Sequence, residues 1–152
     1  MFQRLAAARL QALVRAFPAV AILGARQAGK TTLARMALPG FACADLEDPA
    51  VAQRFRDDPR TAIDAAAGSG GLILDEAQAV PQVFAALRGA IDADRQRNGR
   101  FVILGSAQPA LVRGVAESLA GRSAGVDLDP LSACEAETGA RPCGWRDVWQ
   151  KG

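Results

Sequence analysis

Histidine is absent from this sequence of 152 residues, and cysteine is scarce. The three cysteines, Cys43, Cys134 and Cys143, form an odd, widely spaced set without a C-x-x-C pair. Structural zinc sites use cysteine and histidine at short spacings, so we expect no structural zinc. Free thiols are typical of a reducing compartment, and we therefore expect a cytoplasmic protein.

Long apolar runs are also missing. No stretch approaches the roughly 18 consecutive apolar residues that indicate a membrane span, so we expect no membrane partner. Half of the residues are nevertheless hydrophobic and 22% are charged, which is a globular composition of about one domain. The net charge of +2 is too small to indicate a nucleic-acid partner.

Acidic residues are lacking from the first 44 positions, which carry six basic ones. The opening stretch, "MFQRLAAARLQALVRAF", resembles a transit peptide in its arginine content but contains no serine. Its apolar residues recur at helical spacing, which predicts a packed leading helix over 1–17, ending before Pro18. A helix lying on a membrane surface is the alternative.

Three continuous apolar runs, 19–23, 71–76 and 100–106, are typical of strands buried on both faces of a parallel sheet. Two weaker strand candidates cover 41–46 and 124–128. The expected helices cover 30–38, 49–57, 59–67 and 82–94, with a short broken helical segment at 109–120. Because strands alternate with helices, we predict an α/β fold with a mostly parallel five-stranded sheet and helices on both faces.

Lysine occurs only twice, as Lys30 and Lys151, and Lys30 lies in a glycine-framed stretch, "GARQAGKTTL". The stretch fits the pattern G-x-x-x-x-G-K-S/T of a phosphate-binding loop, between a predicted strand and a predicted helix. Glycines let backbone amides approach the phosphates, lysine reaches the β- and γ-phosphates, and the Thr31 hydroxyl binds Mg²⁺. The expected nucleotide-binding residues are Gly24, Ala25, Arg26, Gln27, Ala28, Gly29, Lys30, Thr31 and Thr32.

An acid pair, Asp75 and Glu76, follows the predicted strand "LIL". Ligands of open α/β sheets bind at the carboxyl ends of strands, so we expect Asp75 to be a second Mg²⁺ ligand. Glu76 is placed to orient or deprotonate an attacking water. An adjacent glutamate favours ATP hydrolysis over GTPase or metabolite-kinase chemistry. Two solvated acids at a strand end are the alternative.

Two further catalytic candidates follow. Ser106 ends the third apolar run, where it could sense the γ-phosphate or cap the next helix; Gln108 is a second sensor candidate. Arg122, after Gly121, is a candidate arginine finger that neutralises charge on the transferring phosphate. The sequence holds sixteen arginines, and any one of them is more often a solvated surface group.

Several stretches together resemble the bacterial and archaeal AAA-type P-loop ATPases that carry an uncharacterised C-terminal domain. They are "GARQAGKTTL", "DLEDP", "LILDEAQAVPQVFAALRGAID", "GRFVILGSAQPALVRGVAESLAGR" and "DLDPLS", in the order of that family. The resemblance implies that the strand ending in Ser106 lies between the loop strand and the Asp75 strand. It also implies Glu76 as the hydrolytic glutamate, Ser106 as the sensor and Arg122 as a contact of the γ-phosphate, within its own subunit or from a neighbour.

The resemblance leaves some positions without a role. Gln78 falls where the family often has glutamine, with no function that we can assign. Ala77 replaces a larger aliphatic residue and Leu104 a frequent threonine, and neither change removes a catalytic group.

The domain expectation is an ATPase domain over 1–132, followed at 133–152 by the start of a truncated C-terminal region. The family normally continues there into a second domain with a winged-helix-like part, which is a candidate for DNA binding. We therefore expect a Mg²⁺-dependent ATPase with ATP as its ligand. A nucleotide-gated switch with negligible turnover is the alternative. A protein partner or a homo-oligomer is possible, and DNA only through the missing region.

Overall fold

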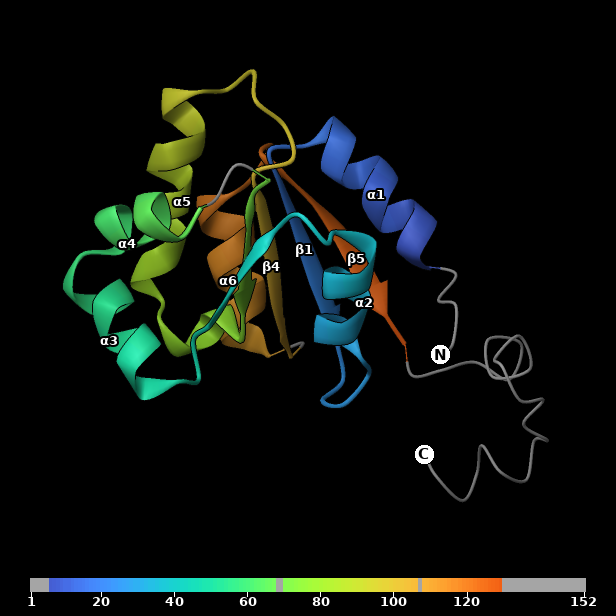
Figure 1. The fold of residues 1–152 in the computed structure, drawn as a ribbon, viewed down its shortest axis with the longest axis horizontal. Coiled ribbons are helices and arrows are strands. Elements are labelled where there is room, and N and C mark those ends of the chain that lie inside the picture. Colours follow the sequence, from blue (N-terminus) through green and yellow to red (C-terminus); the bar gives the residue numbers. More distant parts are fainter. Residues whose placement is uncertain (1–5, 68–69, 107, 130–152) are drawn as a thin grey trace.

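The computed structural model describes residues 6–67, 70–106 and 108–129. Its centre is a five-stranded sheet in the order β2-β3-β4-β1-β5, and every strand pair is parallel (Figure 1). The strands are β1 (Ala19–Gly24), β2 (Ala42–Asp45), β3 (Leu72–Asp75), β4 (Phe101–Ser106) and β5 (Ser123–Leu128). Because all strands run the same way, their carboxyl ends share one edge of the sheet.

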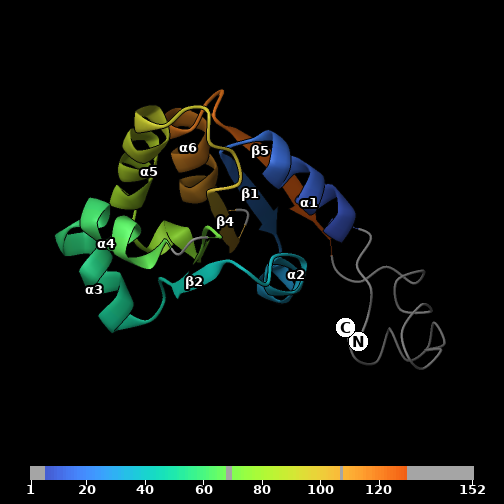
Figure 2. The ribbon, with the colours of Figure 1, turned by 45° about the horizontal axis from the view of Figure 1, so that its top comes forward.

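Helices cover both faces of the sheet, as Figure 2 shows. One face carries α1 (Ala6–Ala16) and α2 (Lys30–Ala37). The other carries α3 (Pro49–Asp57), α4 (Pro59–Ala66), the single-turn η1 (Ala77–Ala79), α5 (Gln82–Ala93) and α6 (Pro109–Ser118). The predicted α/β class and two-faced sheet are confirmed, and the strand ending in Ser106 does lie between β1 and β3.

The core alternates along each strand, because successive side chains point to opposite faces. In β1, Ala19 and Ala21 pack toward α3–α6, whereas Val20 and Ile22 pack toward α1 and α2. The apolar runs are therefore continuous because both faces are buried.

Helix starts follow local chemistry. Asp48 precedes α3 and its carboxylate accepts the backbone N–H groups of Ala50 and Val51 at 2.8 and 3.2 Å. Asp58 caps α4 in the same way through Thr61 N–H at 3.0 Å. Each cap is followed by a proline, whose fixed φ suits the first helical turn.

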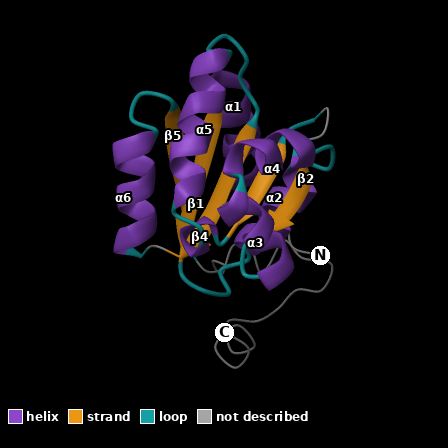
Figure 3. Cartoon of the chain, turned by 90° about the vertical axis from the view of Figure 1, so that its left-hand side faces the viewer, coloured by secondary structure: helices purple, strands orange, loops and turns teal. Residues whose placement is uncertain are grey.

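The segment 109–120 is not broken as predicted: it contains one continuous helix, α6. Gly114 within this helix allows close packing, because a Cβ there would lie 2.7 Å from the ring of Phe84 on α5. Figure 3 shows α5 and α6 covering the same face of the sheet.

The leading helix, expected over 1–17, is described from Ala6 to Ala16. The region 133–152, with Cys134, Cys143 and Lys151, lies outside the described residues. Within the described part of the chain, no helix combines the length and apolar character needed to cross a bilayer.

Candidate functional site

The loop between β1 and α2 contains two residues with a left-handed backbone conformation, Gln27 (φ 63°) and Gly29 (φ 83°). Gly24, at its start, is held against the β5 backbone, since an added Cβ would lie 2.3 Å from the Leu128 carbonyl oxygen. Ala28 N–H donates to the Ala25 carbonyl at 3.3 Å, which tightens the turn. The loop therefore ends at the amino terminus of α2, where exposed amides and the helix dipole favour an anion.

Lys30 is the buried cation of this loop, with 5% of its surface exposed. Its Nζ donates to the carbonyl oxygens of Ala25, at 2.8 Å, and Gly24, at 3.2 Å. Within the described ranges, Lys30 forms no ion pair with a carboxylate. The loop thus holds a positive charge near neutral acceptors only, which is the electrostatic requirement of a phosphate site.

Thr31 and Asp75 meet across the site. The Thr31 hydroxyl donates to Asp75 Oδ2 at 2.6 Å, joining the first turn of α2 to the end of β3. Asp75 is 9% exposed, and its other oxygen accepts the Glu76 N–H at 3.1 Å. A hydroxyl and a carboxylate at one point are hard oxygen donors of the kind that Mg²⁺ prefers, so the donor set fits this ion.

Glu76 lies beyond the strand end with a left-handed backbone, φ 49° and ψ 49°. This conformation is uncommon for a residue with a side chain and occurs often at functional sites. Gln78 Nε2 donates to Glu76 Oε2, so the carboxylate is held from the side of η1. The sequence showed the D-E-x-Q spacing, but it could not show that the amide contacts this glutamate.

Ser106 lies next to the loop in the sheet, since its Cα pairs with Gly24 in the β1–β4 register. It is 7% exposed, and its hydroxyl has no hydrogen-bond partner among the described atoms. The capping alternative is not observed, because Gln108 takes the N-cap position of α6, without a side-chain cap bond. Gln108 is exposed, and so is Thr32 on α2.

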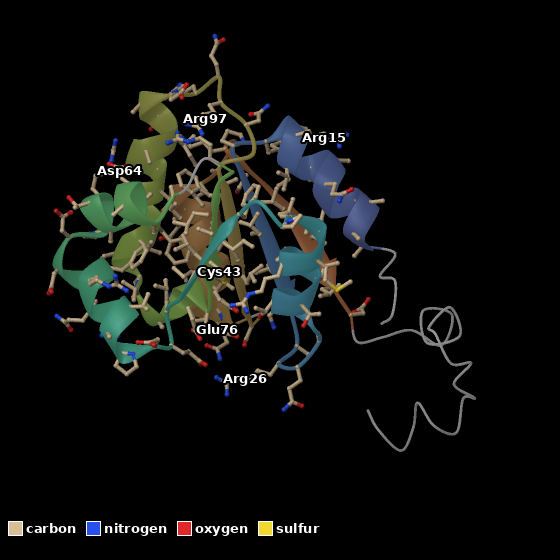
Figure 4. All side chains as sticks on the ribbon, in the orientation of Figure 1. Arg15, Arg26, Cys43, Asp64, Glu76 and Arg97 are labelled. Atoms are coloured by element: carbon tan, nitrogen blue, oxygen red, sulfur yellow. The ribbon has the colours of Figure 1, made fainter. Side chains whose placement is uncertain are left out.

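Arg26 of the loop pairs with an acidic residue that follows β2. Its guanidinium pairs with Glu47 at 3.3 Å, linking the loop to the segment after β2. Both side chains are more than half exposed, so the pair is a weak link. Figure 4 shows Arg26 and Glu76 at the same end of the molecule. Sequence reasoning missed Glu47, because nothing in "DLEDP" indicates which cation its acids face.

Arg122 does not join this site. It precedes β5, and its carbonyl accepts the Ala19 N–H at 3.3 Å, at the amino edge of the sheet. The loop follows the other end of β1, about 17 Å away at 3.3 Å per residue. Within one chain, therefore, the structure does not bring Arg122 to the loop, and the expected γ-phosphate contact requires a neighbouring subunit.

The Arg122 guanidinium is instead engaged by Asp92 of α5. Nε and one terminal nitrogen donate to the two carboxylate oxygens at 2.8 and 3.1 Å, in a two-pronged pair. Hydrogen bonding from Arg122 holds the pKa of Asp92 below its ordinary value, and the same bond raises the pKa of Arg122. This arrangement joins α5 to the start of β5.

Comparisons with known proteins identify the family and the fold. A family model described as an AAA domain matches residues 16–137. Two relatives are 42% identical over 146 residues: the uncharacterized protein Rv2008c of Mycobacterium tuberculosis and the uncharacterized protein Mb2031c of Mycobacterium bovis. The match covers 94% of this chain and 32% of each relative, so the chain spans about a third of their length.

A solved structure, the Walker-type ATPase PABY2304 of Pyrococcus abyssi, is similar in fold. The TM-score is 0.60 with 19% sequence identity, over 90% of this chain and 56% of that one. At this identity the likeness concerns the fold, which is that of a P-loop ATPase.

Proposed function

The chain belongs to the AAA domain family, and from this premise we propose that it binds ATP with Mg²⁺ and hydrolyses the nucleotide to ADP and phosphate. The observation that carries the proposal is the state of Lys30. Among the described residues, this buried ammonium donates hydrogen bonds to carbonyl oxygens of its own loop and has no negative partner. A phosphate chain supplies that charge, and the amides at the start of α2 supply matching donors.

Thr31 and Asp75 would hold the magnesium ion, Thr31 through its hydroxyl and Asp75 through its carboxylate or a water. When bound, Mg²⁺ neutralises charge on the phosphate oxygens. The hydrogen bond between the two residues keeps both donors in place in the free chain. Asp75 is also fixed by the Glu76 amide, so little rearrangement is needed to receive the ion.

Glu76 would act as the general base. It is adjacent to Asp75, yet its left-handed backbone turns it out of the strand direction, so the two carboxylates have different surroundings. Accepting a proton from an attacking water is worth typically about 10²–10⁴-fold in rate. Ser106, one strand away from Glu76 and level with Gly24, would donate its free hydroxyl to the terminal phosphate.

The loop and the start of α2 would contribute backbone amides to the phosphates. The central residues are Arg26, Gln27, Ala28 and Gly29, and the flanking ones are Gly24, Ala25 and Thr32. A protein partner or a second copy of the chain, and DNA bound through a C-terminal region, are proposals that follow from the family resemblance. A cytoplasmic location is a proposal that follows from the cysteine usage.

A second candidate is a nucleotide-gated switch with negligible turnover. One observation favours it: the Glu76 carboxylate accepts a hydrogen bond from Gln78, which competes with a water for that oxygen. Binding of ATP is common to both candidates, so only turnover distinguishes them.

Steady-state phosphate release at saturating ATP and Mg²⁺ tests the proposal, with Glu76→Gln as the comparison. The ATPase account predicts measurable turnover that falls about 10²–10⁴-fold in the variant, while ATP affinity is retained. Equal turnover in both proteins would contradict the role of Glu76. Binding without turnover in either would select the switch.

A further inference from the structure

Gln78 connects two parts of the molecule that the proposed mechanism treats separately. It lies in η1, and its Nε2 donates to Glu76 Oε2. The other end of the same amide, Oε1, is buried and has no hydrogen-bond partner among the described atoms. One end of the side chain is thus committed to the proposed base, and the opposite end is unused.

The unused end faces the strand that carries Ser106. A Cβ added to Gly105 would lie 2.3 Å from Gln78 Oε1 and 2.6 Å from Leu111 Cδ2. The amide therefore occupies the space that a side chain at Gly105 would fill, between the end of β4 and α6. Glycine at position 105 is what permits this contact.

Two side-chain atoms in the described part of the chain are buried without a partner, Gln78 Oε1 and Ser106 Oγ. A Cβ at Gly105 would overlap the first of them, and Gly105 immediately precedes Ser106 in β4. Buried polar atoms are nearly always hydrogen-bonded, so such exceptions require an explanation. An amide oxygen can only accept a hydrogen bond, whereas a hydroxyl can both donate and accept one. The Ser106 hydroxyl can therefore donate to a phosphate oxygen or to another acceptor.

The single turn η1 does not need the Gln78 side chain to hold its shape. The turn is already closed by its backbone, through the bonds from Ala79 N–H to the Glu76 carbonyl (3.0 Å) and from Val80 N–H to the Ala77 carbonyl (3.2 Å). The Gln78 amide adds nothing to these bonds. Its contacts are directed at Glu76 and at the end of β4 instead.

We propose that Gln78 is a positioning residue that couples the Glu76 carboxylate to the Gly105–Ser106 strand end, so that the phosphate sensor sets the orientation of the base. The proposal rests on the ATPase function proposed above. In the free chain Gln78 holds Glu76. Successive side chains of β4 point to opposite faces of the sheet, so Gln78 Oε1 and the Ser106 hydroxyl are connected through the backbone of Gly105. When Ser106 gains a partner, a shift of this backbone moves the amide and, through it, the Glu76 carboxylate.

Three variants test this. Gln78→Leu keeps much of the volume and removes both polar ends. Gly105→Ala leaves Gln78 present but displaces it, because the new Cβ would overlap Oε1. The matched control is Gln53→Leu, since Gln53 Nε2 also donates to a carboxylate, Asp57 Oδ1 at 2.7 Å, on the exposed surface of α3.

We expect Gln78→Leu and Gly105→Ala to lower kcat about ten- to a hundredfold with KM for ATP within about twofold, because a misplaced base slows chemistry rather than binding. Gln53→Leu should leave both constants unchanged. Combined with Glu76→Gln, Gln78→Leu should cause no further loss of kcat, since the base that it positions is already gone. Independent, multiplying losses would overturn the proposal.

A binding measurement completes the test. Calorimetry should show that the free chain distinguishes a non-hydrolysable ATP analogue from ADP, and that Gln78→Leu and Ser106→Ala reduce this discrimination alike.

Chemical denaturation of the nucleotide-free chain should show that Glu76→Ala and Gln78→Leu have non-additive effects on the free energy of unfolding. Additive denaturation and intact discrimination would refute the coupling. A wild-type chain that binds no nucleotide would sink the proposed function, even if denaturation still revealed the contact.

Discussion

Lys30 and Arg122 are two cations at opposite edges of one sheet, and their surroundings differ in kind. Lys30, at the carboxyl edge, is buried, and in the part of the chain that the structure describes its ammonium group bonds to carbonyl oxygens of its own loop and to no carboxylate. Arg122, at the amino edge, is paired through two hydrogen bonds with Asp92. A cation whose charge is already matched contributes to the fold, whereas one held without a counter-charge is available to a ligand.

The two edges differ as a whole. The carboxyl edge gathers the loop, Thr31, Asp75 and Glu76, with Ser106 directly beside the loop in the strand register. Figure 4 shows Glu76 and Arg26 at this end, and Arg15 and Arg97 at the opposite one. Chemistry concentrates where parallel strands end, because loops and helix amino termini converge there. The amino edge carries arginines as well, but its best-defined contact is an ion pair between elements.

The largest effect should come from removing the unmatched cation. Lys30→Ala is expected to weaken ATP binding more than about a hundredfold, because charge-assisted hydrogen bonds to phosphate are lost. Calorimetric titration with ATP and Mg²⁺ measures this directly. Replacing Lys151, the other lysine, should leave the affinity unchanged. Full ATP affinity in Lys30→Ala would remove the distinction between the two edges.

A smaller effect is expected at the metal ligand. Asp75→Asn should lower the affinity for the Mg²⁺–ATP complex about ten- to a hundredfold, and should change binding measured without the ion much less. Titrations with Mg²⁺ and with a chelator separate the two. Asp64→Asn, an exposed aspartate paired with Arg60 on α4, is the matched control. If Asp75→Asn weakened binding equally without the ion, its carboxylate would have a structural role only.

The smallest effect is expected at the amino edge. Arg122→Ala should lower the melting temperature by about 1–4 °C and leave turnover per folded molecule unchanged. Bonding to Arg122 lowers the pKa of folded Asp92, so this stabilisation is complete above the unfolded aspartate pKa, about 3.9. It is lost as the pH falls through the lower folded value. The stability difference from wild type should therefore be present at pH 7 and vanish in strong acid.

Arg60→Ala removes an exposed pair within α4 and serves as the control, with a smaller shift or none. Lower turnover in Arg122→Ala, with unchanged stability and ATP affinity, would instead indicate an arginine finger. In that case mixing Arg122→Ala with Glu76→Gln chains should restore activity, because a neighbouring subunit would supply the missing group.

Local sequence patterns were sufficient for the fold. Continuous apolar runs predicted the strands, and prolines after Asp48 and Asp58 marked where α3 and α4 begin. The broken segment expected over 109–120 was wrong, because α6 is continuous. Glycine weakens a helix in general, but Gly114 allows α6 to approach Phe84. The effect of that glycine depends on a neighbouring helix, which no local pattern reveals.

For the candidate site, the sequence was most informative where a motif implies geometry. The loop pattern and the acid pair predicted that Thr31 and Asp75 would lie together, and they are joined at 2.6 Å. Arg122 shows the limit. The sequence showed that Arg122 precedes a strand. It did not show at which edge of the sheet that strand begins, because this depends on the parallel pairing of β5 with β1. The hydrogen bond from Gln78 to Glu76 likewise depends on the three-dimensional arrangement and is not visible in a local sequence pattern.

The most direct test of the contrast between Lys30 and Arg122 is an experimental structure of the chain with a non-hydrolysable ATP analogue and Mg²⁺. The account predicts that Lys30 Nζ leaves the carbonyl oxygens of Gly24 and Ala25 for the phosphates, while Arg122 stays on Asp92 of its own chain. Phosphates bound elsewhere, with Lys30 still on the two carbonyls, would contradict it.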